Sequence, residues 1–95
     1  MKVVWSNRAL RSLADVHYRL SADSEDAANK MVNRILQRGD GLGAFPHLGR
    51  LVDRYKRPEI RELIEPPYRI MYRVRKEQVE VVDVFHSAQL PPWER

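Results

Sequence analysis

The residues with the clearest capacity for chemistry are basic, and they cluster. Between Arg50 and Lys76 the sequence holds nine lysines and arginines against four acidic residues, a local charge of +5, so the rest of the chain carries −1. A basic sector of this kind attracts an acidic partner, such as nucleic acid, a phosphate-bearing substrate or an acidic protein segment. It also occurs simply as a solvated face. The charge pattern alone leaves these four interpretations open.

Other chemistries lack the residues they need. The 95 residues include no cysteine, which excludes a thiol nucleophile, a thiolate metal site and a disulfide framework. His17 has no second histidine four positions away, so the chain offers no zinc-type pair there. A lone histidine on an apolar helix stripe is more often a residue at the edge of the core than a ligand. We therefore expect no metal site and no cofactor.

The composition, 43% hydrophobic and 32% charged, is that of a folded protein. Its length suits one domain, residues 1–95, with a single core. No run of about 18 apolar residues is present to span a membrane. Strand-like and polar residues follow Met1-Lys2 at once, so we expect no signal peptide and a cytoplasmic protein.

Three apolar segments dominate the second half of the chain and predict an antiparallel meander. They are Ile60–Ile64, Tyr68–Val74 and Val79–Phe85, rich in β-branched and aromatic residues and separated by short polar or proline-containing turns. The middle segment alternates apolar and basic residues with a period of two, which predicts one wet face. The last is apolar at nearly every position, which predicts a strand covered on both sides. Tyr68 and Tyr72 are predicted to lie in the core, and Met71 to fill it.

The first half predicts a strand followed by a helical hairpin. Residues 2–5 are β-branched and aromatic, and Ser6 is a suitable N-cap for a helix whose apolar stripe is Leu10, Leu13, His17 and Leu20. A second helix should start near Ser24, bury Ala28, Met31, Ile35 and Leu42, weaken through its glycines and stop at Pro46. The two stripes require burial, and the meander is the available partner.

Two irregular segments complete the chain. Residues 46–59 lack a sustained period and predict a long basic loop, with Gly49 at a position where a positive φ is permitted. The tail from Gln89 contains Pro91-Pro92 and Trp93, whose ring is either docked on the body or offered to a partner. The predicted fold is α+β: a strand, an antiparallel two-helix hairpin and a three-stranded antiparallel meander, with the helices packed on one face of a curved sheet.

This order of elements, with the motifs it carries, resembles the ParE/RelE superfamily of toxins from type II toxin–antitoxin systems. The resemblance runs along almost the whole chain, and its order and spacing are more specific than any single piece. The matching pieces are Val4-Trp5 with Ala9, Leu10 and Leu13, then Arg34-Ile35, Phe45-Pro46, Gly49-Arg50, Arg61-Glu62-Leu63, Tyr68–Val74, and Val82-Asp83-Val84-Phe85-His86-Ser87-Ala88-Gln89. The family fold is a curved, mainly antiparallel sheet with a helical hairpin packed on it.

The resemblance implies one of two activities. RelE-like members are ribosome-dependent endoribonucleases, in which the 2′-hydroxyl of mRNA attacks the adjacent phosphate with the help of a base, an acid and cations. In this chain Arg69 would clamp the phosphate and His86 would act as acid or base, with Arg61 or Lys56 as further cations. ParE-like members inhibit DNA gyrase and need a binding surface, for which Arg50, His86 and Trp93 are the target-contact residues predicted here.

The sequence favours the ParE-like branch. Where RelE-like nucleases carry lysines along the first meander strand, this chain has Ile60 and Glu62. After the last strand, where the nucleases carry an arginine and an aromatic acid or base, it has Ala88-Gln89 and then Leu90-Pro91. We therefore expect a gyrase-binding toxin and no catalytic residues. An ion pair of Arg61 and Glu62 with Arg69 on the next strand, and a purely structural His86, are the alternatives for those residues.

The resemblance also implies a partner. A ParD-like antitoxin would form a heteromeric complex by laying an acidic, partly disordered segment over the hairpin and along the sheet. The predicted antitoxin-binding residues are Leu13, His17, Leu20, Met31, Arg69 and Arg73. A basic nucleic-acid-binding module without a protein partner is a further alternative, although the sequence carries no known reader motif.

Overall fold

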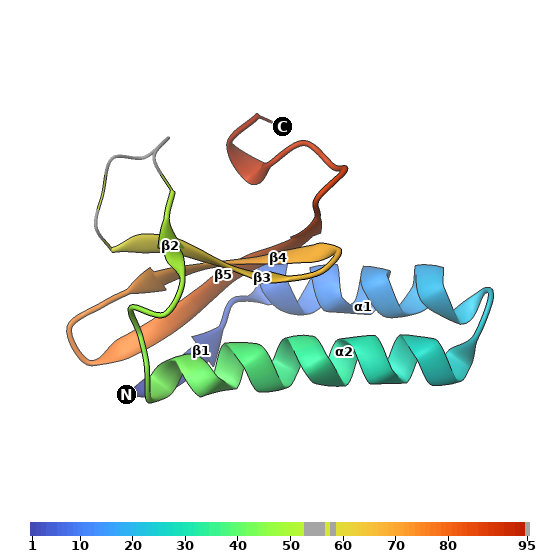
Figure 1. Cartoon of the computed structure of the whole chain (residues 1–95), viewed down its shortest axis with the longest axis horizontal. Coiled ribbons are helices and arrows are strands. Elements are labelled where there is room, and N and C mark those ends of the chain that lie inside the picture. The colour runs from blue at the N-terminus through green and yellow to red at the C-terminus, as the bar shows by residue number, and fades with distance from the viewer. Residues whose placement is uncertain (53–56, 58, 95) are drawn as a thin grey trace.

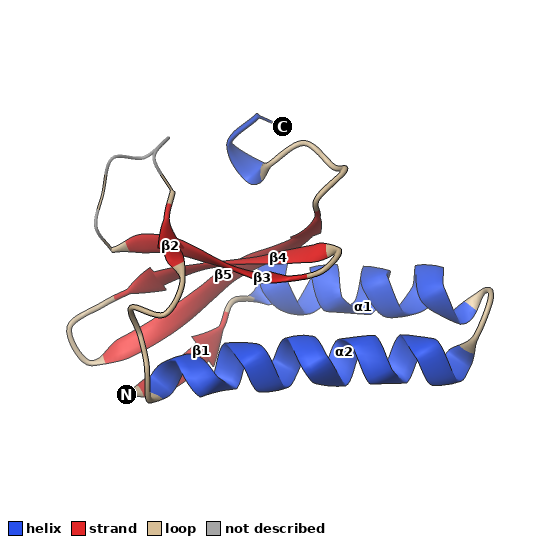
Figure 2. Ribbon diagram, in the orientation of Figure 1, coloured by secondary structure: helices blue, strands red, loops and turns tan. Residues whose placement is uncertain are grey.

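The computed structural model describes residues 1–52, 57 and 59–94, and of Trp93 only the backbone. Two helices lie against one face of a five-stranded sheet (Figures 1 and 2). Along the chain the elements are β1 Lys2–Trp5, α1 Asn7–Ser21, α2 Glu25–Asp40, a 3-10 turn Gly41–Gly43, β2 Arg50–Leu51, β3 Ile60–Glu65, β4 Tyr68–Val74, β5 Gln78–His86 and a 3-10 turn Pro92–Glu94. This confirms the predicted α+β fold with its helical hairpin and meander.

Both helices start at serine caps, of which the sequence predicts the one at Ser6, and the second helix starts near Ser24 as predicted. The Ser6 hydroxyl accepts from the Ala9 N–H at 3.0 Å, and the Ser24 hydroxyl accepts from the Ala27 N–H at 3.1 Å. Each satisfies one of the free amides of a first turn. The predicted stripe of α1 was wrong at Leu10, which is 48% exposed, because the buried line runs through Ala9, Leu13 and Val16 instead.

The second helix ends earlier than predicted. It stops at Asp40, and Gly41–Gly43 continues as a 3-10 turn, so Pro46 lies beyond the helical segment. A 3-10 turn is a common way to tighten the C-terminus of an α-helix. It leaves Leu42 fully buried, which is why the apolar stripe suggested a longer helix.

The sheet has the order β1-β5-β4-β3-β2. The meander pairs antiparallel throughout, with Tyr68 opposite His86 and Glu62 opposite Met71. The strand β1 pairs parallel with β5, with Lys2 opposite Gln78. The first and the last strand of the chain are therefore neighbours in the sheet. An irregularity between Met71 and Tyr72 shifts the register of β4 against β5.

The core lies between the helices and the sheet. Tyr72, Ile70, Val79 and Val81 from the strands meet Leu13, Val16 and Ile35 from the helices, and all are buried. The tyrosines are core residues, as predicted. The opposite face of the sheet, which we call the open face, carries no helix from α1 or α2 and holds a smaller buried cluster: Val52, Ile60, Met71 and Phe85, with Val82 packed beside it. Figure 1 shows β2 and the C-terminal segment on this side.

The predicted long loop contains a short strand. Arg50 and Leu51 pair with Glu62 and Arg61 and so extend the sheet by one edge strand. Gly49 does not adopt the positive φ that a glycine permits, since no described glycine has one. Gly49 is required for space instead: a Cβ there would lie 2.5 Å from the Glu62 carbonyl oxygen and 2.7 Å from the Tyr72 hydroxyl.

Candidate functional site

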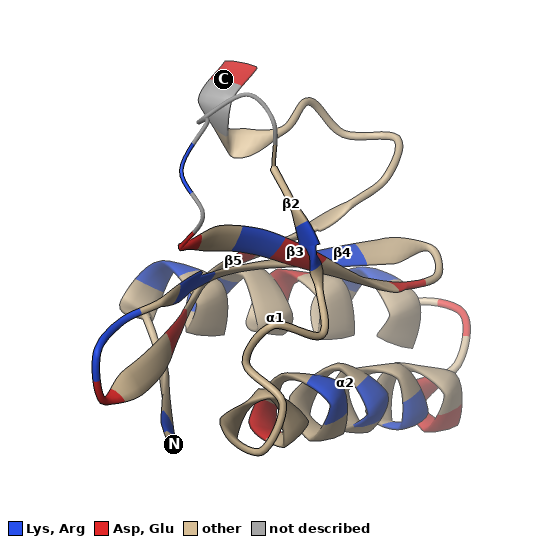
Figure 3. Ribbon diagram, turned by 60° about the vertical axis from the view of Figure 1, so that its left-hand side comes forward, with Lys and Arg blue, Asp and Glu red and all other residues tan. Residues whose placement is uncertain are grey.

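The centre of the open face is a buried carboxylate held by two arginines. Glu62 on β3 is 3% exposed. Arg69 on β4 donates to it through Nε at 2.9 Å and through Nη2 at 2.6 and 2.8 Å. Arg50 on β2 donates through Nε at 2.7 Å, and its Nη2 lies 2.6 Å from the same carboxylate oxygen. Figure 3 shows the basic and acidic segments of these three neighbouring strands side by side. We call this set the Glu62 cluster.

Strand pairing explains the Glu62 cluster. Arg50 is directly opposite Glu62, and Arg69 precedes by two positions the residue opposite Glu62, so all three side chains project from the same face. The cross-strand ion pair anticipated as a structural alternative therefore exists, with Glu62 and Arg69 as its members. Arg69 also lies over the Phe85 ring, with its Cζ 5.0 Å from the ring centroid. Bidentate pairing and ring stacking both hold the guanidinium in place.

Arg61 has a different role from Arg69. Its Nη1 donates to the carbonyl oxygens of Gly49 at 2.7 Å and His47 at 3.3 Å. Its Nε is buried without a partner among the described residues. Arg61 therefore fastens the segment before β2 to the sheet.

Tyr72 fastens the same segment from inside the core. Its hydroxyl accepts from the Gly49 N–H at 2.8 Å and donates to the Pro46 carbonyl at 2.9 Å. Burial raises the pKa of Tyr72 above its ordinary value, and this outweighs the Gly49 N–H and the Arg61 charge, which act in the opposite direction. Together Tyr72 and Arg61 fix the backbone that presents Arg50.

His86 ends β5 in a turn that uses one of its ring nitrogens. The Ala88 N–H donates to His86 Nδ1 at 2.9 Å, and the ring meets Tyr68 edge to face, with centroids 5.3 Å apart. Since Nδ1 accepts, the neutral ring carries its proton on Nε2. In that tautomer His86 offers a donor and has no free basic nitrogen.

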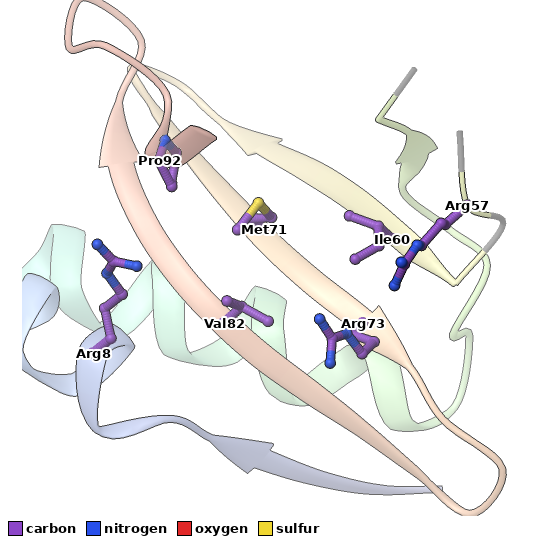
Figure 4. A pocket seen from close by; sticks show the side chains of 7 residues that line it. All are labelled: Arg8, Arg57, Ile60, Met71, Arg73, Val82 and Pro92. Atoms are coloured by element: carbon purple, nitrogen blue, oxygen red, sulfur yellow. The ribbon is translucent and has the colours of Figure 1, made fainter. Parts of the chain in front are cut away.

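A hollow of about 430 Å³ lies beside the Glu62 cluster on the open face. We call it the arginine hollow, and its lining consists of Arg8, Arg57 and Arg73 around Ile60, Met71, Val82 and Pro92. In Figure 4 Arg8 and Pro92 lie at one end and Arg57 and Arg73 at the other, with Met71 and Val82 between them. Its volume falls in the range of small binding sites.

The predicted antitoxin-binding residues fall into two groups. Leu13 on α1 is buried in the core between the helices and the sheet, and Leu20 and Met31 pack against that core. The Nε2 of His17 lies 2.8 Å from the side-chain oxygen of Asn29 across the hairpin. Arg69 and Arg73 lie on the open face, beyond the sheet. The structure thus does not bring the six together on one surface. Of the other predicted cations and contacts, Lys56 and the side chain of Trp93 lie outside the described residues.

Several charged residues were missed as candidates. Arg8 belongs to the first helix and Arg57 to the loop, and only the fold brings them to Arg73. A row of cations along α2, Lys30, Arg34 and Arg38, is visible in Figure 3, and its spacing of four residues was a readable signal. Arg38 forms an ion pair with Glu65, whose carboxylate lies 3.3 Å from the Arg38 Nε. Within the described part of the chain no group of three potential metal ligands occurs, and no helix is long and apolar enough to cross a membrane.

The fold, with a helical hairpin on one face of a curved mixed sheet, is the one shared by ParE and RelE toxins. It matches the structure of the chromosomal ParDE toxin–antitoxin system of P. aeruginosa with a TM-score of 0.76 at 19% identity, covering 90% of this chain and 95% of that one. It matches the RelBE2 toxin–antitoxin complex of Mycobacterium tuberculosis with a TM-score of 0.67 at 20% identity, covering 93% and 92%.

Sequence comparison identifies the family. Residues 3–91 match the model of the ParE toxin of the type II toxin–antitoxin system parDE. Toxin RelE2 of Caulobacter vibrioides is 36% identical over 90 residues, which cover 94% of this chain and 98% of that protein. The chain therefore belongs to the ParE toxin family, and it is a type II toxin of the ParE/RelE kind.

Proposed function

We propose that this toxin acts by binding DNA gyrase and inhibiting it, and that it does not cleave RNA. The observation that carries the proposal is the Glu62 cluster. Arg69 is the residue that would clamp a phosphate, and it spends its Nε and Nη2 donors on a carboxylate of the same chain. A phosphate at that place would have to displace Glu62, and separating a buried ion pair leaves an uncompensated charge.

The other groups needed for RNA cleavage are also engaged. Attack by a 2′-hydroxyl requires a base within hydrogen-bond reach. The Nδ1 of His86 already accepts from the Ala88 N–H, so the neutral ring has no free basic nitrogen. Arg61 donates to backbone carbonyls at 2.7 and 3.3 Å. Among the described residues, the arginines and the base expected of a nuclease are thus used to build the sheet and its turns.

A binding toxin needs an exposed surface, and the open face offers one. The side chain of Arg50 is 67% exposed even though it reaches Glu62, so part of its guanidinium faces solvent. The Nε2–H of His86, which lies against Tyr68 at the end of β5, is a further potential donor. Arg50, His86 and Trp93 remain our proposed target contacts.

The partner that neutralises the toxin is, in this proposal, a ParD-like antitoxin bound in a heteromeric complex. Two structures with the same fold are those of toxin–antitoxin systems, ParDE and RelBE2. The open face combines cations with an apolar cluster, which suits an acidic segment that folds on binding.

A RelE-like ribonuclease is the second candidate. The observation that favours it is the relative named RelE2. Strand pairing sets Arg69 opposite Phe85 and Tyr68 opposite His86, so the two residues Arg69 and His86 lie one position apart on neighbouring strands and their side chains project from opposite faces of the sheet. In this branch Arg61, Arg69 and His86 would be catalytic.

Supercoiling of relaxed plasmid by purified gyrase and ATP tests the proposal, with a quinolone as the positive control. We expect inhibition or accumulation of cleaved complex, weakened by Arg50→Ala and unchanged by Arg34→Ala, which removes an exposed arginine from α2. The proposal fails if gyrase is unaffected while mRNA is cut in a translating extract and the cutting is lost with Arg69→Ala.

A further inference from the structure

We propose that the arginine hollow is a docking site for an extended acidic segment of the antitoxin, in which two carboxylate side chains flank an aliphatic one. The inference rests on the antitoxin partner of the proposed function, and it adds the place and the chemistry of the contact. Charge complementarity carries it, since three arginines and no acidic residue line the hollow among the described residues.

The arginines of the hollow differ from those of the Glu62 cluster in having donors to spare. Arg73 makes no ion pair or hydrogen bond to any described residue, and its Nε is buried without a partner. A buried donor left unpaired costs free energy, so it marks a place where an acceptor belongs. Glu80 lies opposite Arg73 on β5, but its ion pair, at 3.5 Å, is with Arg75.

Arg8 is only loosely held at the other end. Its Nε is 3.7 Å from Asp83, longer than a hydrogen bond. That carboxylate already accepts from the Ser12 hydroxyl at 2.6 Å and from the Val84 N–H at 2.8 Å. Arg8 is 56% exposed at its side chain and can turn its guanidinium to an external anion.

The floor of the hollow selects a peptide over a nucleic acid. Ile60, Met71 and Val82 are aliphatic or thioether side chains, and Pro92 forms a wall. Single-stranded nucleic acids are held chiefly by bases stacked on aromatic rings, and none lines this hollow in the described part of the chain. An aliphatic side chain fits such a floor and gains by its burial.

The dimensions set the spacing of the acidic residues. The floor residues come from three adjacent strands, β3, β4 and β5, which span about 10 Å at the usual strand separation. An extended peptide advances about 3.3 Å per residue and presents every second side chain to the same side. Acidic residues four positions apart therefore span about 13 Å, with an aliphatic residue midway, which matches cations at two ends and an apolar centre.

The test uses the whole chain and a defined probe, the fluorescein-labelled peptide Ser-Glu-Ser-Val-Ser-Glu-Ser. Fluorescence anisotropy measures its binding, and the methyl NMR signal of Met71 reports on the hollow, with Met31 in the opposite core as internal reference. We expect saturable binding that shifts Met71 and not Met31. Arg73→Met and Arg57→Met should each weaken binding roughly fivefold to tenfold, the loss of one charge-assisted contact. Arg34→Met on α2 is the matched control and should change nothing.

Each contrary outcome overturns the inference. These outcomes are equal binding of the peptide with glutamine in place of glutamate, absence of a Met71 shift, and insensitivity to both arginine substitutions. Tighter occupation of the hollow by an oligouridylate than by the peptide would assign the site to nucleic acid instead. The result is separable from the gyrase assay. A toxin that binds the peptide without inhibiting gyrase loses its proposed target alone, and one that inhibits gyrase but ignores the peptide loses this docking site alone.

Discussion

Replacing Glu62 with glutamine tests whether its carboxylate holds the centre of the open face together. The side chain is 3% exposed, and both Arg50 and Arg69 donate to it. Removing one partner of a buried ion pair costs about 3–5 kcal/mol. Glutamine keeps one acceptor oxygen for Arg69, and Arg50 is 67% exposed at its side chain, so its charge is largely solvated after the change.

The expected loss is therefore below that range. We expect Glu62→Gln to lower the free energy of unfolding by about 2–3 kcal/mol. At about 4–8 °C per kcal/mol for a domain of this size, the melting temperature should fall by roughly 10–20 °C. Urea unfolding followed by circular dichroism measures the free energy of unfolding, and a thermal melt followed by the same signal measures the melting temperature. The matched control, Glu77→Gln in the exposed turn before β5, should stay within about 0.5 kcal/mol of the wild type.

Two further measurements test the same prediction. A Glu62→Met and Arg69→Met double variant should recover much of the loss, because a buried ion pair replaced by apolar side chains is often neutral. The single Glu62→Gln variant should also elute from heparin at higher salt than the wild type, since two cations lose their internal counter-charge. If Glu62→Gln unfolds like Glu77→Gln and binds heparin like the wild type, then the Glu62 cluster has no energetic weight. The main argument against phosphate clamping by Arg69 would then be lost.

Three more predictions concern the supports of the site. Gly49→Ala should destabilise the protein by about 1–3 kcal/mol in urea unfolding, because its Cβ meets the backbone of β3, whereas Gly41→Ala, with nothing within 4 Å, should be neutral or slightly stabilising. Because the pKa of Tyr72 is raised on folding, the unfolded chain loses that proton first; stability should therefore fall as pH rises above about 10, and Tyr72→Phe should flatten this slope. Equal slopes for the two proteins would contradict the assignment. Ser12→Ala removes the 2.6 Å hydrogen bond to buried Asp83 and should cost about 1.5–3 kcal/mol, and a loss below 0.5 kcal/mol would show that water replaces the hydroxyl.

The elements of the fold were predictable where a local signal existed. The first helix starts at the predicted Ser6 cap and the second near Ser24, and the alternation from Tyr68 to Val74 gives a strand with its tyrosines in the core. The placement of β1 beside β5 has no local signal, because parallel pairing joins Lys2 to Gln78 across most of the chain. The strand β2 has two residues, too few to show a period, so it was predicted as loop.

The site was predictable in its residues but not in their partners. Arg50, Arg61 and Arg69 were all identified as basic candidates, yet two of them serve one carboxylate and the third serves backbone carbonyls. What decides this is the register of β3 against its two neighbours, which sets Glu62 between Arg50 and Arg69 and turns Arg61 to the other side. A shift of one residue would exchange the two faces and free Arg69. Sequence patterns give the face of each residue only after the register is known.

The distinction between neutralised and uncommitted arginines is what connects the fold to a function. A basic sector acts on a partner only through the donors that the chain itself leaves unused. On the open face Arg69 and much of Arg50 are used, whereas around the aliphatic floor of the hollow Arg73 pairs with no described residue and Arg8 lies 3.7 Å from Asp83. The Glu62 carboxylate neutralises much of the positive charge of Arg50 and Arg69. An external anion is therefore attracted mainly to the arginine hollow. A partner that supplies carboxylates there would pair with the arginines of the hollow without competing with Glu62, which is the reason for our proposal that this toxin recognises proteins through this face.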